Sequence, residues 1–238
     1  MSFIPVDLNH LSLIEGSTPF RTRVVLPFRN HFHMFMYLPR LLLRLRLPPG
    51  HTESIHPALL YSIYLAACSV GGGGMSGYES RFLAQARTES EHALAFVDRL
   101  IDFMWASVIL ASYFLRRGRI VEAHNMILGT VGFAMAVGLH RAPGTLGPES
   151  IILPPADEIE KHDRVVLWYA LTQLEASISM RIGLPTVTPK DVCSPNSPHN
   201  TITKMILHHF EASNQCRGVL FPVNSKCEHL HFSITRKY

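Results

Sequence analysis

The run IDFMWASVILASYFLRR at positions 101–117 decides the fold class. When it is wound as a helix, apolar side chains occupy most of its circumference, and neither proline nor glycine interrupts it. A helix with this pattern is buried on most sides, so it requires other helices around it. Gly118 follows the run directly and is expected to end the helix there.

Helical patterns on both sides of this run predict the elements that surround it. We expect further helices at 29–46 (bent at Pro39), 57–68, 79–97, 120–139, 157–183 and 201–213. A run of four glycines at 71–74 and a turn-rich segment at 141–155 separate some of them. No segment combines strict alternation with β-branched residues over the length of a strand. The predicted fold class is therefore all-α, an irregular antiparallel helical bundle with solenoid-like helix pairs.

The composition predicts a chain with a large core and three regions. Of the 238 residues, 47% are hydrophobic and only 17% are charged, which favours a sizeable core and either a surface that meets a partner or a missing segment. We expect an irregular, basic, proline-rich segment at 1–54, a helical domain at 55–215 and a divergent tail at 216–238. The longest apolar stretch, at 103–115, is too short to cross a bilayer, so no membrane partner is expected.

The cysteine pattern argues against a zinc cluster and against secretion. Because the cysteines are scattered and no signal-peptide pattern begins the chain, we expect a reduced, intracellular compartment. The chain has no Cys-x-x-Cys pair, and four thiolates cannot supply the six that a binuclear zinc cluster needs. The four cysteines are Cys68, Cys193, Cys216 and Cys227.

Two histidine-containing patterns have a metal-binding alternative. Cys216, Cys227, His229 and His231 are potential zinc ligands in the tail, but their spacing is not a standard structural zinc pattern, and an unstructured tail is favoured. His31 and His33 lie on a basic segment without a nearby cysteine or acid, so we interpret them as ordinary polar positions. No cofactor is expected.

Six arginines and no acid lie between positions 16 and 52. Three interpretations are open: contact with phosphates, a solvated face, or contact with an acidic partner. The last two interpretations are favoured. The arginines alternate with apolar residues and do not form a compact run, which also argues against a nuclear-import signal. The six are Arg21, Arg23, Arg29, Arg40, Arg44 and Arg46.

Patterns typical of enzymes are missing from the sequence. No glycine-rich phosphate loop joins a strand to a helix, and neither Gly-x-Ser-x-Gly nor His-Glu-x-x-His occurs. A cluster of four acids resembles the carboxylates of helical prenyl-transferring enzymes only superficially, because a helix N-terminus accounts for it better. We predict that the chain is not an enzyme. The four acids are Asp157, Glu158, Glu160 and Asp163.

Three ordered motifs resemble the regulatory (middle homology) domain of fungal zinc-cluster transcription factors. VGLHR at 137–141 resembles the family's A-x-x-L-G-L-H-R signature, and LWYALTQLE at 167–175 with GLP at 183–185 resembles its W-x-x-Y-x-x-D-R-x-x-S-x-x-x-G-R-P helix. HPALL at 56–60 resembles its H-P-x-L-L helix start, so the resemblance covers roughly 56–195. The signature positions are His56, Pro57, Gly138, Leu139, His140, Arg141, Trp168, Glu175, Gly183 and Pro185.

The chain departs from the family pattern at three positions and at its C-terminal end. Glu175 stands where the family usually has Asp, Ala176 replaces a basic residue, and Leu184 replaces the Arg of Gly-Arg-Pro. The family region normally continues well past 195, which suggests a truncated or divergent C-terminus. Independently of the family, His140 is expected to be stabilised by the dipole at a helix C-terminus, and Trp168 is expected to lie in the core.

The resemblance implies a non-catalytic role in regulating transcription in the nucleus, through a small-molecule effector or co-regulators. In that family, DNA recognition and zinc belong to a separate cysteine-rich module, so contact with DNA is not expected through this chain itself. The alternative is a free-standing helical adaptor, or a competitor of full-length regulators, without DNA binding. The sequence does not indicate an oligomeric state.

Overall fold

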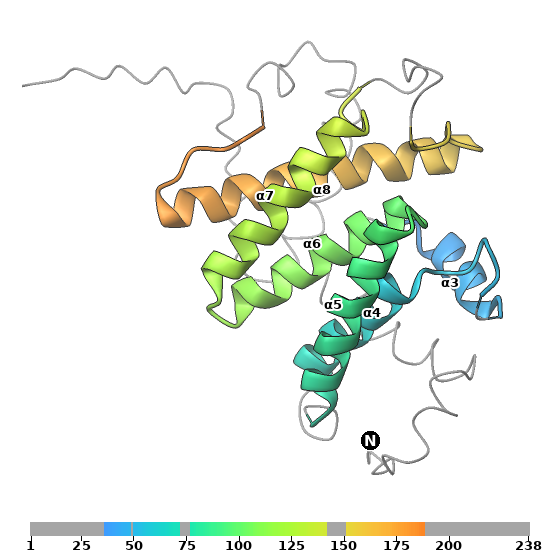
Figure 1. Cartoon of the computed structure of the whole chain (residues 1–238), viewed down its shortest axis with the longest axis horizontal. Helices are drawn as coiled ribbons and strands as arrows, with labels where there is room; N and C mark the ends of the chain where they lie inside the picture. Colours follow the sequence, from blue (N-terminus) through green and yellow to red (C-terminus); the bar gives the residue numbers. More distant parts are fainter. Residues whose placement is uncertain (1–35, 49, 72–76, 142–150, 189–238) are drawn as a thin grey trace, which may run out of the picture.

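The computed structural model describes residues 36–48, 50–71, 77–141 and 151–188. The described residues contain six helices and no strand, so the predicted all-α class is confirmed (Figure 1). The predicted helix at 201–213, the tail at 216–238, His31 and His33 lie outside the described residues. The helices are α3 (Leu38–Arg46), α4 (Pro57–Gly71), α5 (Glu79–Ala95), α6 (Leu100–Arg116), α7 (Ile120–Ala136) and α8 (Glu158–Ile182).

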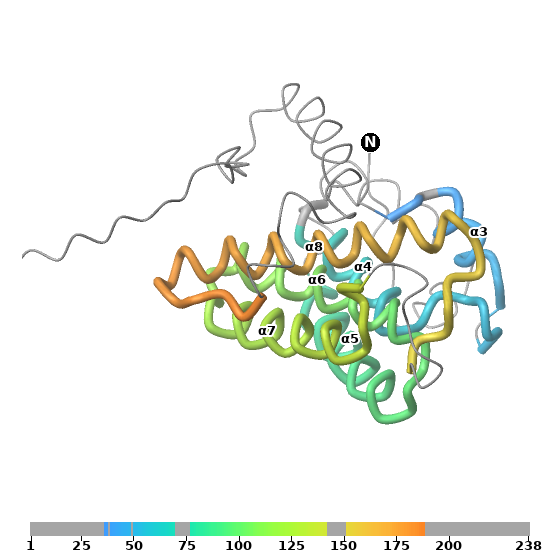
Figure 2. Tube along the Cα trace, turned by 90° about the horizontal axis from the view of Figure 1, so that it is seen from above, coloured from blue at the N-terminus to red at the C-terminus, as the bar shows by residue number. Residues whose placement is uncertain are grey.

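Helix α6, formed by the apolar run, is the centre of the bundle. It packs against α4, α5, α7 and α8, and each helix from α4 to α8 also packs against the next one in sequence. Seen from above, α8 lies on one side and α5 on the opposite side, with α6 between them (Figure 2). Buried side chains such as Met104, Trp105 and Phe114 cover its circumference, as its pattern predicts.

Helix ends follow local chemistry more closely than apolar periodicity. Helix α3 begins at Leu38, and Pro39 lies in its first turn instead of bending the middle of a longer helix; the predicted start at 29 lies outside the described residues. Proline is tolerated in a first turn because the N–H groups of that turn have no acceptor within the helix, so the N–H that proline lacks is not needed there. Helix α7 ends at Ala136, three residues earlier than predicted, because Gly138 adopts a left-handed conformation with φ +81°.

The turn between α5 and α6 is tight and contains no glycine. Helix α5 ends at Ala95, and both Val97 (φ 54°) and Arg99 (φ 43°) adopt left-handed conformations. Such conformations cost a residue with a side chain about 1 kcal/mol or more, so they persist only where surrounding contacts hold them. At Arg99 the contacts are hydrogen bonds from its guanidinium to Asp98 and to the carbonyl and hydroxyl oxygens of Ser54.

None of the helices in the described ranges combines the length and apolar character that crossing a bilayer requires.

Candidate functional site

The structure distributes the signature positions over three places in the bundle. The first is the start of α4, the second is the junction between α7 and α8, and the third is the C-terminal end of α8. The first place holds His56 and Pro57; the second holds Gly138, Leu139, His140, Arg141 and Trp168; the third holds Glu175, Gly183 and Pro185.

At the start of α4, His56 caps the helix through both its side chain and its backbone. The backbone N–H of Ala58 donates a hydrogen bond to His56 Nδ1 (3.1 Å), and Pro57 occupies the first helical position. This side-chain acceptor satisfies one of the N–H groups that a helix start leaves without an intrahelical partner. The His-Pro pair therefore fixes where α4 begins.

A buried carboxylate ties this helix start to α6 and α3. Asp102 is 2% exposed and accepts the backbone N–H of His56 at 2.9 Å. Arg44 of α3 donates to both carboxylate oxygens, at 2.9 and 2.6 Å, and also to the carbonyl oxygens of Glu53 and Ser54. Although burial acts to lower the pKa of Arg44, the adjacent Asp102 raises it above its ordinary value. One carboxylate thus joins three segments of the chain.

Sequence reasoning missed this network. The sequence pattern places Arg44 among the basic N-terminal arginines and gives no partner for Asp102. Asp102 itself could have indicated the network, because a carboxylate at the start of a buried helix requires a charged or hydrogen-bonding partner.

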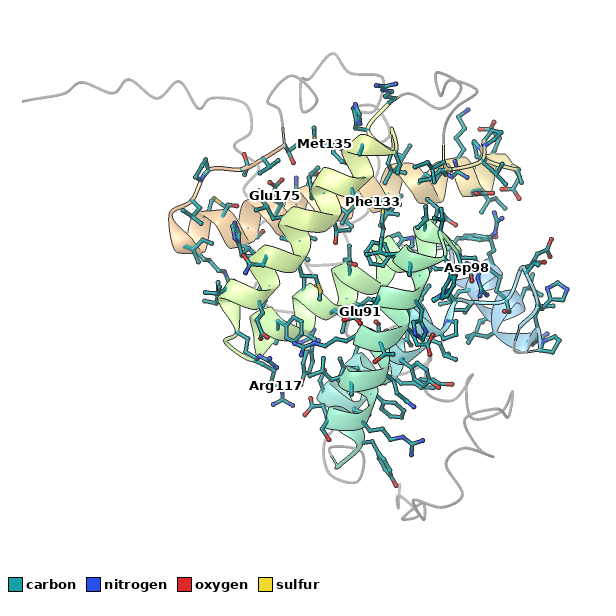
Figure 3. The ribbon with its side chains drawn as sticks, viewed as in Figure 1. Glu91, Asp98, Arg117, Phe133, Met135 and Glu175 are labelled. Atoms are coloured by element: carbon teal, nitrogen blue, oxygen red, sulfur yellow. The ribbon has the colours of Figure 1, made fainter. Side chains whose placement is uncertain are left out.

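The imidazole of His56 is held neutral beside this network. Because Nδ1 accepts from Ala58, the ring proton of the neutral form lies on Nε2, which is 3.6 Å from Asp98 Oδ2. Burial and then the positive charge of Arg99 lower the pKa of His56 below its ordinary value. Side-chain hydrogen bonds from Arg99 lower the pKa of Asp98. Figure 3 shows Asp98 at the end of the bundle nearest α3.

We expect His56 to make folding stability depend on pH below about 6.5, the ordinary pKa of histidine. As the pH falls through that value, the unfolded chain binds a proton at His56 before the folded chain does. The free energy of unfolding should therefore decrease until the lowered pKa of the folded state is passed. Urea unfolding of the wild type and of His56→Asn, which keeps a capping oxygen, measures this difference at a series of pH values.

The wild-type minus variant difference should be constant above pH 6.5 and should decrease below it. Keeping the series above about pH 5 excludes carboxylates such as Asp98, which titrate lower. Parallel pH profiles for the two proteins would contradict the assignment to His56.

At the second place, two of the three motifs meet. The ring of His140 packs against that of Trp168 with centroids 5.9 Å apart and an interplanar angle of 49°. Gly138 ends α7 in a Schellman-type turn, in which the N–H of Leu139 donates to the carbonyl oxygen of Ala134 (2.9 Å). His140 follows directly after this turn. Leu139 and Trp168 are buried, as predicted for Trp168, whereas Arg141 is exposed.

At the third place, Glu175 holds the segment that follows α8. Its side chain is fully buried and accepts hydrogen bonds from the backbone N–H of Val187 (2.5 Å) and from the hydroxyl group of Thr188. Figure 3 shows Glu175 on α8. Gly183 reverses the chain with φ +69°. The acid therefore binds the returning backbone, while Leu184, in the position of the family's Arg, is about half exposed.

The acids at the start of α8 have structural partners, and so does one arginine of α3. Asp157 accepts the N–H of Glu160 at 2.6 Å and so caps α8, and it also binds Arg40 at 2.9 Å. Glu160 pairs with Arg164 and Asp163 accepts the backbone N–H of Tyr37. These pairings favour a partner within the chain for Arg40, as Asp102 does for Arg44. Arg21, Arg23 and Arg29 lie outside the described residues.

The described ranges contain possible metal ligands and one cysteine thiol, that of Cys68. In residues 36–48, 50–71, 77–141 and 151–188, no three His, Cys, Asp or Glu side chains gather as a metal-binding group. Cys68 is buried on α4, and burial raises the pKa of its thiol to about 12, so the thiolate that metals and electrophiles require is not formed near neutral pH. Cys193, Cys216, Cys227, His229 and His231 lie outside the described residues.

No family model, no curated protein and no solved structure matches the chain.

Proposed function

We propose that this chain is the regulatory domain of a nuclear transcription regulator similar to the fungal zinc-cluster factors. The observation that supports the proposal is a contact between two motifs, made by residues 28 positions apart in the sequence. His140 of the Val-Gly-Leu-His-Arg motif lies against Trp168 of the motif on α8. The role is non-catalytic, and small-molecule effectors or co-regulators are its partners. DNA recognition and any zinc belong to a cysteine-rich module that four scattered cysteines cannot form.

The arrangement suits a domain that responds to a partner. The junction between α7 and α8 joins the two motifs, and α7 and α8 both pack against the central α6. A ligand or protein that binds one arrangement of this junction more tightly than another shifts the equilibrium between them. The departures at Ala176 and Leu184 lie elsewhere, at the C-terminal half of α8 and just beyond it.

A tethering experiment tests the proposal. The full chain is fused to an unrelated DNA-binding module and expressed in yeast with a reporter gene under that module's sites. We expect expression of the reporter to differ from that given by the module alone. A fusion that is kept out of the nucleus should not change it. An unchanged reporter, with the fusion shown to be nuclear and the purified chain shown to be folded, would overturn the proposal and leave the adaptor alternative.

A further inference from the structure

A notch opens between the turn that follows α7 and the segment that leads into α8. Its enclosed part has a volume of about 20 Å³, which is room for one water-sized group, and one side is open to solvent. Val137, Leu139, Ile152 and Val165 line it together with two arginines, Arg141 and Arg164. Two arginines in the wall of a largely apolar notch require an explanation, because apolar walls alone do not stabilise charge.

Arg164 presents a buried donor in the wall of this notch. The residue is 8% exposed, and its Nη2 atom donates to Glu160 Oε1 at 2.5 Å. Its Nε atom is buried and has no hydrogen-bond partner among the described residues. A buried N–H group without an acceptor is unfavourable, and in native proteins such groups are almost always paired with a protein group, a water or a ligand.

Arg141 is the second arginine that lines the same notch. It is exposed, and its side chain makes no hydrogen bond or ion pair within the described part of the chain. Glu160 already pairs with Arg164, so the charge at the notch that lacks a counter-ion in the described part of the chain is that of Arg141. Planar guanidinium groups match the two oxygens of a carboxylate better than any other charged side chain does.

Exposed apolar side chains adjoin the notch in sequence. Ile151 is 61% exposed and Leu153 is 78% exposed, and they flank Ile152, which lines the notch. Exposed aliphatic side chains beside an opening favour a ligand that has an apolar part outside the notch and a polar part inside it.

The geometry points to a binding site for a carboxylate that carries an apolar group. One carboxylate oxygen enters the notch and accepts from Arg164 Nε, the other lies at the opening and accepts from Arg141, and the apolar group lies on the exposed side chains of Ile151 and Leu153. Such a ligand is either a small aliphatic acid or an acidic side chain next to an apolar one in a partner peptide. This inference deepens the proposed function by naming the effector chemistry, but the binding itself is tested without any measurement of transcription.

Equilibrium titration of the full chain with hexanoate, acetate, hexanol and inorganic phosphate tests the site. We expect one hexanoate per chain, weaker binding of acetate and phosphate, and no binding of hexanol. Trp168 lies one helical turn from Arg164, so its fluorescence should change on binding. Because Arg141 is exposed, Arg141→Gln should remain folded and should weaken hexanoate binding about tenfold, the effect of losing one charge-assisted contact.

Two matched variants separate the charge from the apolar surface. Arg46→Gln, which removes an exposed arginine on α3, should leave the affinity unchanged. Leu153→Ser should weaken the binding of hexanoate but not that of acetate. An acetylated and amidated Leu-Glu-Leu peptide distinguishes the sources: if it displaces hexanoate, the site takes a partner peptide, and if it does not, the site takes a small acid.

Three results would overturn the inference. They are the absence of binding at millimolar hexanoate, binding of hexanol as tight as that of hexanoate, and an affinity that Arg141→Gln leaves unchanged. A chain that binds hexanoate but does not affect a tethered reporter would contradict the proposed function alone.

Discussion

Replacement of Asp102 by Asn is expected to lower the free energy of unfolding by about 3 kcal/mol, the lower end of the range for breaking a buried ion pair. The reason is that three donors converge on this buried carboxylate: two from Arg44 and the backbone N–H of His56. Asparagine has the same shape but carries no charge and only one acceptor oxygen, so Arg44 would lose its counter-ion. Urea unfolding followed by far-ultraviolet circular dichroism measures the change.

Asp98 provides the matched control, because it is a nearby acid whose side chain is 44% exposed. Its ion pair with Arg99 is screened by solvent, so Asp98→Asn should cost no more than about 1 kcal/mol. The double variant Arg44→Met, Asp102→Leu leaves no unpaired charge and should recover part of the stability lost in Asp102→Asn. Equal losses for the two Asp→Asn variants would mean that the Asp102 network is not what holds α3 and α4 on α6.

The sequence predicts the helices of this protein better than the contacts between them. An uninterrupted apolar pattern over 101–117 was sufficient to identify the central helix, because such a pattern is stable only when neighbours cover it. The pairing of Arg44 with Asp102 joins residues 58 positions apart, and no local rule indicates which acid an arginine meets. The left-handed Val97 and Arg99 were missed for a similar reason, since distant contacts hold Arg99 in place of a glycine.

At the signature positions, local chemistry was predictable and tertiary partners were not. Pro57 and Gly183 mark helix ends that follow from backbone preferences alone, and the structure places them there. His140 was expected to interact with the helix dipole, and its ring contact with Trp168 depends on how α7 crosses α8. The notch beside Arg141 depends in addition on the segment at 151–155, whose path no periodicity predicts.

Replacement of Glu175 by Gln is expected to lower the free energy of unfolding by about 2 kcal/mol and to release the segment that follows α8. The carboxylate accepts from Val187 and from two groups of Thr188. A glutamine amide can keep one acceptor oxygen, but it places an NH₂ group against donors in a buried site. Loss of that anchor should make residues 183–188 susceptible to limited proteolysis in the native state, which is the more specific measurement.

Comparison of Glu175→Asp with Glu175→Gln decides whether the length or the charge of this side chain matters, and Gln173→Ala is the control. Glu175→Asp, the residue typical of the resembling family, keeps the charge but withdraws the carboxylate by one methylene group, so it should lose one backbone contact and give an intermediate cleavage rate. Gln173→Ala changes an exposed side chain on the same helix and should leave cleavage unchanged. If Glu175→Asp is as resistant as the wild type while Glu175→Gln is cleaved, charge alone holds the segment. If neither is cleaved faster, Glu175 is not the anchor, and the left-handed turn at Gly183 is sufficient to direct the chain back along α8.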